Sequence, residues 1–450
     1  MKRWAVTIIA IFLLSAFPLL FIESPVYARV TAIAAVCLYL WISESAPPFV
    51  PTLLLWALVP IFLGSFDPKY SIASVLSWAV DPVMALFFGG FTLGIATQAF
   101  GLDKRLARFA FRRAGRSYSL FLLLIIVFTA FLSMWLSNIG AAALILACLR
   151  PVLQEFGDDH LMRRTLLIGV ALGADLGGIA TPIGTGPNAI SIAFLAPTIH
   201  VSFISWMAFA LPLTIGMLLL GFGMLWWRTR DISTSWTKRD DKFKAALSEA
   251  GEGTDPAGQM AFLTVLVITA LLWLTEPLHK IPSAVVAIGS AAFIFLSGML
   301  RKKDLAKLDW STLVLIAGGI TLGRLFEQSG LIRSLAANVP FGDLDPRVSL
   351  FVLCLSSALL ASLMSNTATA VLLIPLAYAL VPFPSTAILI AVSASFGIPF
   401  VISTPQNAMA YGEGGVKFGD MFWPGIGLMI VGCLVVSLTG RAILNFAGIP

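Results

Sequence analysis

Apolar residues fill most of this 450-residue chain in long runs, and short polar or charged stretches separate these runs. The runs lie at 4–22, 30–43, 49–65, 83–100, 118–153, 167–196, 203–227, 260–276, 281–299, 311–329, 348–380, 385–411 and 421–447. Since about 20 apolar residues cross a bilayer as a helix, we predict an all-α polytopic membrane protein with about 11 transmembrane helices.

Two runs, 118–153 and 348–380, are too long for one crossing, and each carries a Ser-Asn pair near its middle. We interpret each as a re-entrant hairpin that enters and leaves the membrane on the same side. Two further runs, 167–196 and 385–411, are interrupted by Pro and Gly. Because Pro removes a backbone donor and Gly relaxes the backbone, we predict unwound segments there. Such breaks are tolerated only where they line a cavity or bind ions.

The composition excludes several classes of protein. The chain is 58% hydrophobic and 12% charged, whereas about a quarter of an average soluble domain is charged. An ordinary soluble enzyme, a disordered protein and a nucleic-acid-binding protein are therefore excluded. Most of the 29 Lys and Arg residues fall in loops that become cytoplasmic when the N-terminus is inside. We expect a multi-pass protein of the plasma (inner) membrane with a cytoplasmic N-terminus and an external C-terminus.

The chain lacks the motifs of an enzyme. Its four cysteines lie within apolar runs, and its three histidines stand outside metal-binding spacings. We therefore expect no catalytic residues, no cofactor and no bound metal apart from a coupling ion. The first run lacks a clean cleavage site, so we expect 1–29 to form a retained N-terminal helix rather than a signal peptide.

Several motifs occur twice, in the same order. Trp41 and Glu44 correspond to Trp273 and Glu276, the pair at 137–138 to the pair at 365–366, and 185–188 to 404–407. We predict a first repeat at 30–227, a cytoplasmic linker at 228–259 and a second repeat at 260–450. Each repeat holds an odd number of crossings, so the two are inverted. Inverted repeats are typical of secondary transporters and predict a site near the midplane.

The broken segments suit small ions. Unwound carbonyls can coordinate a hard cation, here predicted to be Na⁺, and half-helix N-termini face an anion. Arg324 lies three residues before Glu327, which favours a local pair over neutralisation of a substrate. For Asp175, structural pairing and proton coupling both stay open.

These motifs resemble the divalent anion:sodium symporter (DASS) family of the ion transporter superfamily, which carries dicarboxylates, citrate or sulfate. The resemblance spans nearly the whole chain. It rests on WISE at 41–44, GGFTLG at 89–94, the Ser-Asn pair at 137–138, GTGPN at 184–188, WLTE at 273–276, GGITLG at 318–323, SNTAT at 365–369 and STPQN at 403–407. The sequence departs from the family pattern at Ile139, Gly186 and Gln406.

The resemblance implies a homodimer that works as an elevator-type transporter, with two sodium sites and one anion site. One sodium site would use Ser133, Ser137, Asn138 and Gly184, and the other Ala361, Asn366 and Ser403. The anion would contact Asn138, Thr185, Ser365, Asn366, Thr367 and Thr404. We therefore expect Na⁺-coupled symport of a small divalent anion, with Na⁺, the anion, the bilayer and a second copy as partners. A Na⁺-independent exchanger is the alternative within transport; an intramembrane enzyme and a passive anion channel are alternatives of other classes.

Overall fold

The computed structural model describes residues 2–43, 45–101, 113, 117–153, 160–230, 256–331, 334, 345–401 and 403–449. Within these ranges the chain forms helices joined by turns, and no strand occurs. The predicted all-helical fold is thus confirmed for the described part of the chain. Of the predicted linker at 228–259, residues 231–255 lie outside this part, as does Glu44.

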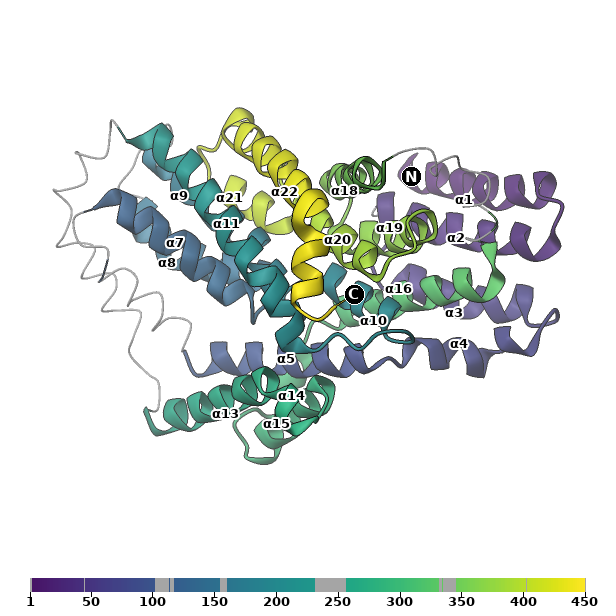
Figure 1. Ribbon diagram of the computed structural model, residues 1–450, viewed down its shortest axis with the longest axis horizontal. Helices are drawn as coiled ribbons and strands as arrows, with labels where there is room; N and C mark the ends of the chain where they lie inside the picture. The colour runs from purple at the N-terminus through teal and green to yellow at the C-terminus, as the bar shows by residue number, and fades with distance from the viewer. Residues whose placement is uncertain are drawn as a thin grey trace.

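Twelve helical elements make up the described chain up to residue 230, here called the first half. They are α1 (Lys2–Phe21), α2 (Pro25–Ser43), α3 (Val50–Leu63), the 3-10 helix η1 (Pro68–Tyr70), α4 (Ile72–Ala79), α5 (Pro82–Ala99), α7 (Tyr118–Ser133), α8 (Asn138–Leu153), α9 (Leu161–Gly177), the 3-10 helix η2 (Gly178–Ala180), α10 (Gly186–Leu195) and α11 (Phe203–Thr229). In Figure 1, α1 to α4 lie together at one end of the molecule, while α7, α8 and α9 lie at the other.

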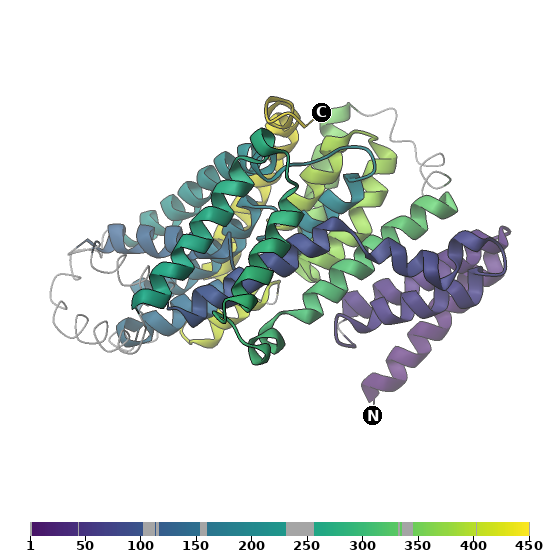
Figure 2. The same ribbon diagram turned by 90° about the horizontal axis from the view of Figure 1, so that it is seen from below.

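The described chain from residue 256, here called the second half, repeats much of this order. Its elements are α13 (Pro256–Leu274), α14 (Glu276–His279), α15 (Ser283–Leu296), the 3-10 helix η4 (Lys302–Lys307), α16 (Trp310–Ser329), α18 (Pro346–Leu363), α19 (Asn366–Leu380), α20 (Pro384–Ala394), α21 (Pro405–Gly412) and α22 (Phe418–Phe446). Figure 2 shows α13 and α15 beside α5, a helix of the first half.

The two longest apolar runs each form a pair of helices. The run at 118–153 forms α7 and α8, and the run at 348–380 forms α18 and α19. A short turn that contains the first residue of the Ser-Asn pair joins the helices of each pair, and Asn138 and Asn366 begin the second helix. The two runs with Pro and Gly are interrupted as predicted, between α9 and α10 and between α20 and α21.

The structure differs from the sequence-based expectation in two places. Helix α2 begins at Pro25, before the apolar run at 30, because the fixed φ of Pro suits the first turn of a helix. Helix α4 was not predicted. Ser71 caps it by accepting a hydrogen bond from the Ser74 N–H, and only Val75 and Ala79 of its side chains are buried. A helix this short gives no long apolar run.

Helices of the two halves contact each other in matched pairs. In chain order, α3 corresponds to α15, α5 to α16, α8 to α19, α9 to α20 and α10 to α21. The contact of α5 with α15 is matched by that of α16 with α3. The contact of α10 with α19 is matched by that of α21 with α8. The contact of α10 with α20 is matched by that of α21 with α9. Replacing each helix by its counterpart in the other half therefore converts the first contact of each pair into the second. An internal repeat accounts for this pattern, and the opposite orientation of the repeats in the membrane stays a prediction.

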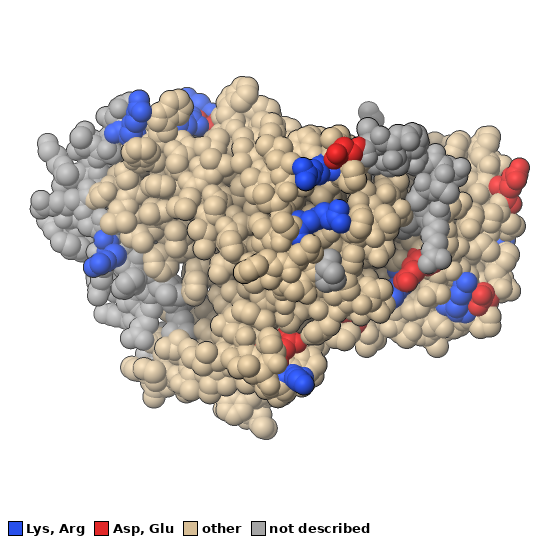
Figure 3. Space-filling view, in the orientation of Figure 1, with Lys and Arg blue, Asp and Glu red and all other residues tan. Residues whose placement is uncertain are grey.

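The outer surface suits a lipid environment. Five of the described helices, α5, α11, α13, α18 and α22, are long and apolar enough to cross a membrane. Large apolar side chains such as Leu20, Leu296 and Phe446 are exposed, and the face in Figure 3 has few charged side chains. In a soluble protein, apolar patches of this extent are rare. The number of 11 crossings stays a prediction, because several shorter or interrupted helices would have to complete it.

Candidate functional site

The turn between α7 and α8, here called the first tip, is held by side chains that face the break after α9. The Ser133 hydroxyl lies 2.7 Å from Asn138 Oδ1 and 2.7 Å from the carbonyl oxygen of Ala174 in α9. The Thr181 hydroxyl donates to the carbonyl oxygen of Met134 at 2.5 Å. The first tip and the break that follows α9 are therefore joined by hydrogen bonds.

A side-chain oxygen and a backbone oxygen lie close to Gly178, at the end of α9. A Cβ atom at this position would lie 2.5 Å from Asn138 Oδ1 and 3.1 Å from the Gly184 carbonyl oxygen. Only a residue without a side chain permits that approach. Oxygens of three predicted sodium ligands, Ser133, Asn138 and Gly184, thus lie at one place. Neutral oxygens gathered in this way are the ligands that hard cations prefer.

Asn188 holds the break between α9 and α10 in shape. It is fully buried, and its Nδ2 donates to the carbonyl oxygens of Gly178 at 3.0 Å and Thr181 at 2.9 Å. These carbonyls have left the helical pattern and need a donor in a buried place. The Oδ1 atom of the same side chain is buried and has no partner among the described residues.

In the second half, Asn407 holds the break between α20 and α21 in the same way. Asn407 is fully buried, and its Nδ2 donates to the carbonyl oxygens of Ile398 at 3.2 Å and Phe400 at 3.3 Å. Its Oδ1 also has no partner within the described chain.

The turn between α18 and α19, here called the second tip, differs from the first. The serine caps the second helix in both tips, since the Ser365 hydroxyl accepts from the Ala368 N–H as the Ser137 hydroxyl does from the Gly140 N–H; the difference lies one turn earlier. Ala361 stands where the first tip has Ser133, so it offers no hydroxyl to Asn366. Accordingly, Asn366 Oδ1 is buried and lacks a hydrogen-bond partner among the residues that the structure describes.

The two tips and the two breaks meet at one cavity of about 530 Å³. All six residues predicted to contact the anion line it: Asn138, Thr185, Ser365, Asn366, Thr367 and Thr404. The predicted sodium ligands Ser137, Gly184 and Ser403 line it as well. Ser133 and Ala361 do not; both are fully buried behind the tips. A cavity of this size is large enough for a small organic or inorganic anion.

Three departures from the family pattern also lie at the cavity. Ile139 presents an apolar side chain there, and Gln406 presents an amide. At Gly186, a Cβ atom would collide with the side chain of Thr367 in the second tip. A glycine at 186 therefore lets the start of α10 approach the second tip closely.

Sequence reasoning missed one wall of the cavity. This wall comes from α3, α5 and α16 and their flanking residues, and consists of Pro48, Phe87, Phe91, Asp309, Thr312 and Leu315. Asp309 is a helix cap: its Oδ1 accepts from the Thr312 N–H at 3.0 Å and its Oδ2 from the Thr312 hydroxyl at 2.6 Å. A detectable signal was an acidic residue directly before an apolar run, which is typical of a helix start.

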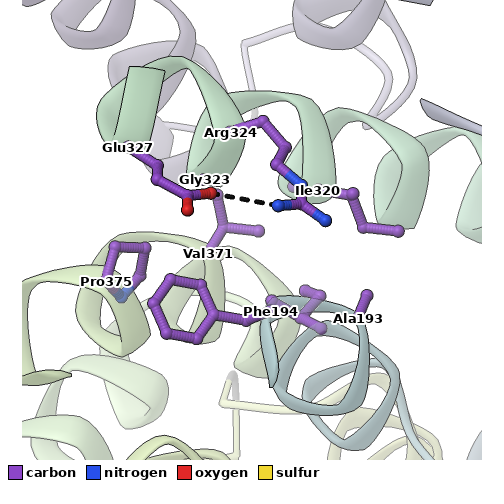
Figure 4. A pocket seen from close by; sticks show the side chains of 10 residues that line it. Ala193, Phe194, Ile320, Gly323, Arg324, Glu327, Val371 and Pro375 are labelled. Atoms are coloured by element: carbon purple, nitrogen blue, oxygen red, sulfur yellow. Dashed lines mark hydrogen bonds and ion pairs between the residues drawn. The ribbon is translucent and has the colours of Figure 1, made fainter. Parts of the chain in front are cut away.

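The cavity contains no Lys or Arg among its described lining residues, and Asp309 is the acidic residue there. Arg324 lies elsewhere, in a small pocket between α10, α16 and α19. Its Nη1 pairs with Glu327 Oε2 at 3.0 Å, as Figure 4 shows, so the predicted local pair is confirmed. The positive charge that an anion needs at the cavity must therefore come from helix N-termini or from bound cations.

Asp175 lies behind the cavity, near the end of α9. It is 1% exposed, and its Oδ1 accepts a hydrogen bond from Gln406 Nε2. The sequence motifs drew attention to each of these residues separately, but nothing in the sequence indicated that they touch.

The comparisons with known proteins agree with this architecture. The family model described as citrate transporter (CitMHS) matches residues 38–388. The chain is 30% identical over 369 residues to the inorganic phosphate transporter PHO87 of Saccharomyces cerevisiae, covering 79% of this chain and 39% of that protein. It is 25% identical over 440 residues to the sodium-dependent dicarboxylate transporter SdcS of Staphylococcus saprophyticus, covering 88% of this chain and 83% of SdcS.

A solved structure shares the fold. The YdaH transporter of Alcanivorax borkumensis superposes with a TM-score of 0.55 at 17% identity, over 90% of this chain and 98% of that one. At this identity the likeness concerns the fold alone. The relatives of the chain include DASS dicarboxylate transporters. Because the citrate transporter model matches residues 38–388, the chain belongs to the CitMHS citrate transporter family, within the ion transporter superfamily, and is a multi-pass membrane transporter.

Proposed function

We propose that the protein is a secondary active transporter that carries a small divalent anion together with Na⁺. The observation that carries this proposal is the charge of the cavity. Two tips and two half-helix starts surround it without a Lys or Arg among the described lining residues. Burying a dianion without positive charge is very costly, and because each helix N-terminus supplies only about half a positive charge, cations that enter with the anion complete its neutralisation.

Oxygens at each tip suit Na⁺ as that cation. In the first half, Ser133, Asn138 and the Gly184 carbonyl converge beside Gly178. In the second half, the buried Asn366 Oδ1 and Asn407 Oδ1 lack partners among the described residues. One Na⁺ at each tip would match the two charges of a divalent anion. The name of SdcS describes sodium-dependent dicarboxylate transport by that relative.

The same geometry supports an order of events. Na⁺ binds first and completes the tips, the anion then binds between them, and the neutral assembly crosses the membrane. We propose an elevator movement in which the tips and breaks slide past the wall formed by α3, α5 and α16. We further propose that the protein works as a homodimer, with its N-terminus in the cytoplasm and its C-terminus outside.

A thermal unfolding experiment tests the coupling without a transport assay. The purified protein is heated with dicarboxylates, tricarboxylates, phosphate or sulfate, in Na⁺ or in K⁺ at equal ionic strength. A ligand that binds only the folded state raises the unfolding temperature. We expect at least one anion to stabilise the protein in Na⁺ and to have little effect in K⁺. Equal stabilisation in both salts would favour the Na⁺-independent exchanger.

A further inference from the structure

The carboxylate of Asp175 is held by the first residues after the second break. Its Oδ1 accepts from Gln406 Nε2, and the Thr404 hydroxyl lies against the same group. The N-terminus of α21, which begins at Pro405, points its partial positive charge toward this region. The other carboxylate oxygen of Asp175, Oδ2, is buried and has no partner within the described ranges. Residues 404–406 therefore stabilise the carboxylate on one side and line the cavity on the other.

No arginine neutralises this carboxylate in the described part of the chain. The basic residues on the helices packed against it are paired elsewhere: Arg164 and Arg228 with Asp420, and Arg150 with Glu413. Arg163, at the opposite end of α9, donates to the Glu413 carbonyl oxygen. Asp175 thus depends on the hydrogen-bond donors of residues 404–406.

This contact determines which end of the Gln406 amide faces the cavity. The NH₂ group of Gln406 donates to Asp175 Oδ1, so this end of the amide faces Asp175. The other end of the amide, Oε1, is then directed away from Asp175. Gln406 lines the cavity, and its Oε1 accepts no hydrogen bond from the described residues. Asp175 thereby makes Gln406 present an acceptor to the cavity.

An acceptor at this position discriminates between anions. An oxyanion oxygen without a proton is repelled by Gln406 Oε1, whereas an O–H group donates to it. An unpaired acceptor in a closed site costs binding energy. We propose that Asp175 positions Gln406 so that the cavity selects dianions that carry an O–H donor, such as monohydrogen phosphate or a hydroxydicarboxylate. This inference rests on the proposed anion transport and narrows its substrate class.

The two halves support a specific role for this pair. The breaks in both halves are held by Asn188 and Asn407, so Gln406 is not needed for that task. By the spacing between these asparagines, Gln406 corresponds to Pro187 in the first half and Asp175 corresponds to Ala394 in the second. Neither Pro187 nor Ala394 can form such a contact. The Asp175–Gln406 pair is therefore an addition to the repeated architecture.

The test compares anions that match in shape and charge but differ in the O–H group. Calorimetry on the purified full-length protein in Na⁺ measures phosphate against sulfate at mildly alkaline pH, and malate against succinate. We expect the wild type to bind at least one O–H-bearing member about tenfold or more tightly than its partner, which corresponds to one hydrogen bond. The pair that shows the preference identifies the source of the O–H group.

Asp175→Asn keeps the shape of the side chain, but it can donate as well as accept, so Gln406 is free to turn. We expect the preference in this variant to fall to within about twofold. Gln406→Met, which removes the amide, should give the same loss and serves if Asp175→Asn does not fold. A purely structural role would lower the affinity for both anions and keep their ratio.

Three results would overturn the inference. If the wild type binds both members of each pair equally, the selection is refuted while anion transport stands. If both variants keep the wild-type ratio, Asp175 and Gln406 do not cause it. If none of the four anions binds in Na⁺ and none is transported, the proposed function fails and this inference fails with it.

Discussion

Asn188 and Asn407 donate hydrogen bonds to corresponding backbone carbonyls in the two halves of the chain. Each side-chain Nδ2 donates to backbone carbonyls of the break before it: to those of Ile179 and Thr181 for Asn188, and to those of Ile398 and Phe400 for Asn407. Both Oδ1 atoms are buried without a partner in the described part of the chain. One residue type thus holds the unwound backbone in both halves and leaves a buried side-chain oxygen in each.

We expect Asn188→Ala to destabilise the protein by about 2 kcal/mol and to abolish transport, because buried carbonyls lose their donor. Thermal unfolding and uptake into proteoliposomes measure the two effects. Asn445→Ala is the control, since Asn445 is exposed on α22 and should tolerate the change. Equal stability and uptake in both variants would contradict the role of Asn188.

The close approach at Gly178 offers a steric test of the first tip. In Gly178→Ala, the added Cβ would lie 2.5 Å from Asn138 Oδ1, so the converging oxygens must move apart. We expect the Na⁺ concentration for half-maximal uptake to rise about tenfold or more, because one oxygen ligand no longer contributes to the free energy of Na⁺ binding. Gly223→Ala on α11 has open space around its Cβ and is the matched control. Unchanged Na⁺ dependence in Gly178→Ala would place the Na⁺ site elsewhere.

The hydroxyl of Ser133 distinguishes the two tips. Ser133→Ala would make the first tip like the second, where Ala361 has no hydroxyl. We expect the Na⁺ concentration for half-maximal uptake to rise several-fold, which corresponds to the free energy of about one hydrogen bond. Thr129→Val, one turn earlier on α7, removes a buried hydroxyl that bonds only within its own helix. If Thr129→Val raises the Na⁺ concentration for half-maximal uptake as much as Ser133→Ala does, a direct role for Ser133 is refuted.

An ion cluster around the buried carboxylate of Asp420 links three helices outside the cavity. Asp420 of α22 pairs with Arg164 of α9 at 3.0 Å and with Arg228 of α11 at 2.5 Å. Asp420→Asn removes the carboxylate charge that both arginines pair with and should destabilise the protein by about 3 kcal/mol. The unfolding temperature measures this effect. Asp67→Asn breaks an exposed pair with Lys69 and should change it little; equal shifts would contradict the importance of the cluster.

Much of the architecture could be predicted from the sequence because lipid imposes a simple rule on it. Apolar runs had to become helices, and Pro and Gly had to interrupt two of them. The repeated Ser-Asn pairs marked both tips. The helix ends were less predictable: α2 begins at Pro25, and the short helix α4 left no recognisable run.

The parts of the site that could not be predicted depend on contacts between distant residues. Periodicity places a residue on a face of its own helix, but it does not say which helix lies opposite. Asp309 and Phe91 reach the cavity because α5 and α16 pack against helices of the other half. Asp175 meets Gln406 for the same reason. The aligned motifs predicted the cavity's two tips but not the wall formed by α3, α5, α16 and their flanking residues.

In the proposed mechanism Na⁺, and not a protein cation, neutralises the anion. Uptake of labelled dicarboxylate or phosphate into proteoliposomes tests it most directly, with an inward gradient of Na⁺, K⁺ or choline. We predict accumulation of the anion with Na⁺ alone, and its loss in Asn138→Ala and Asn366→Ala. Undiminished uptake in K⁺ or choline would contradict the account.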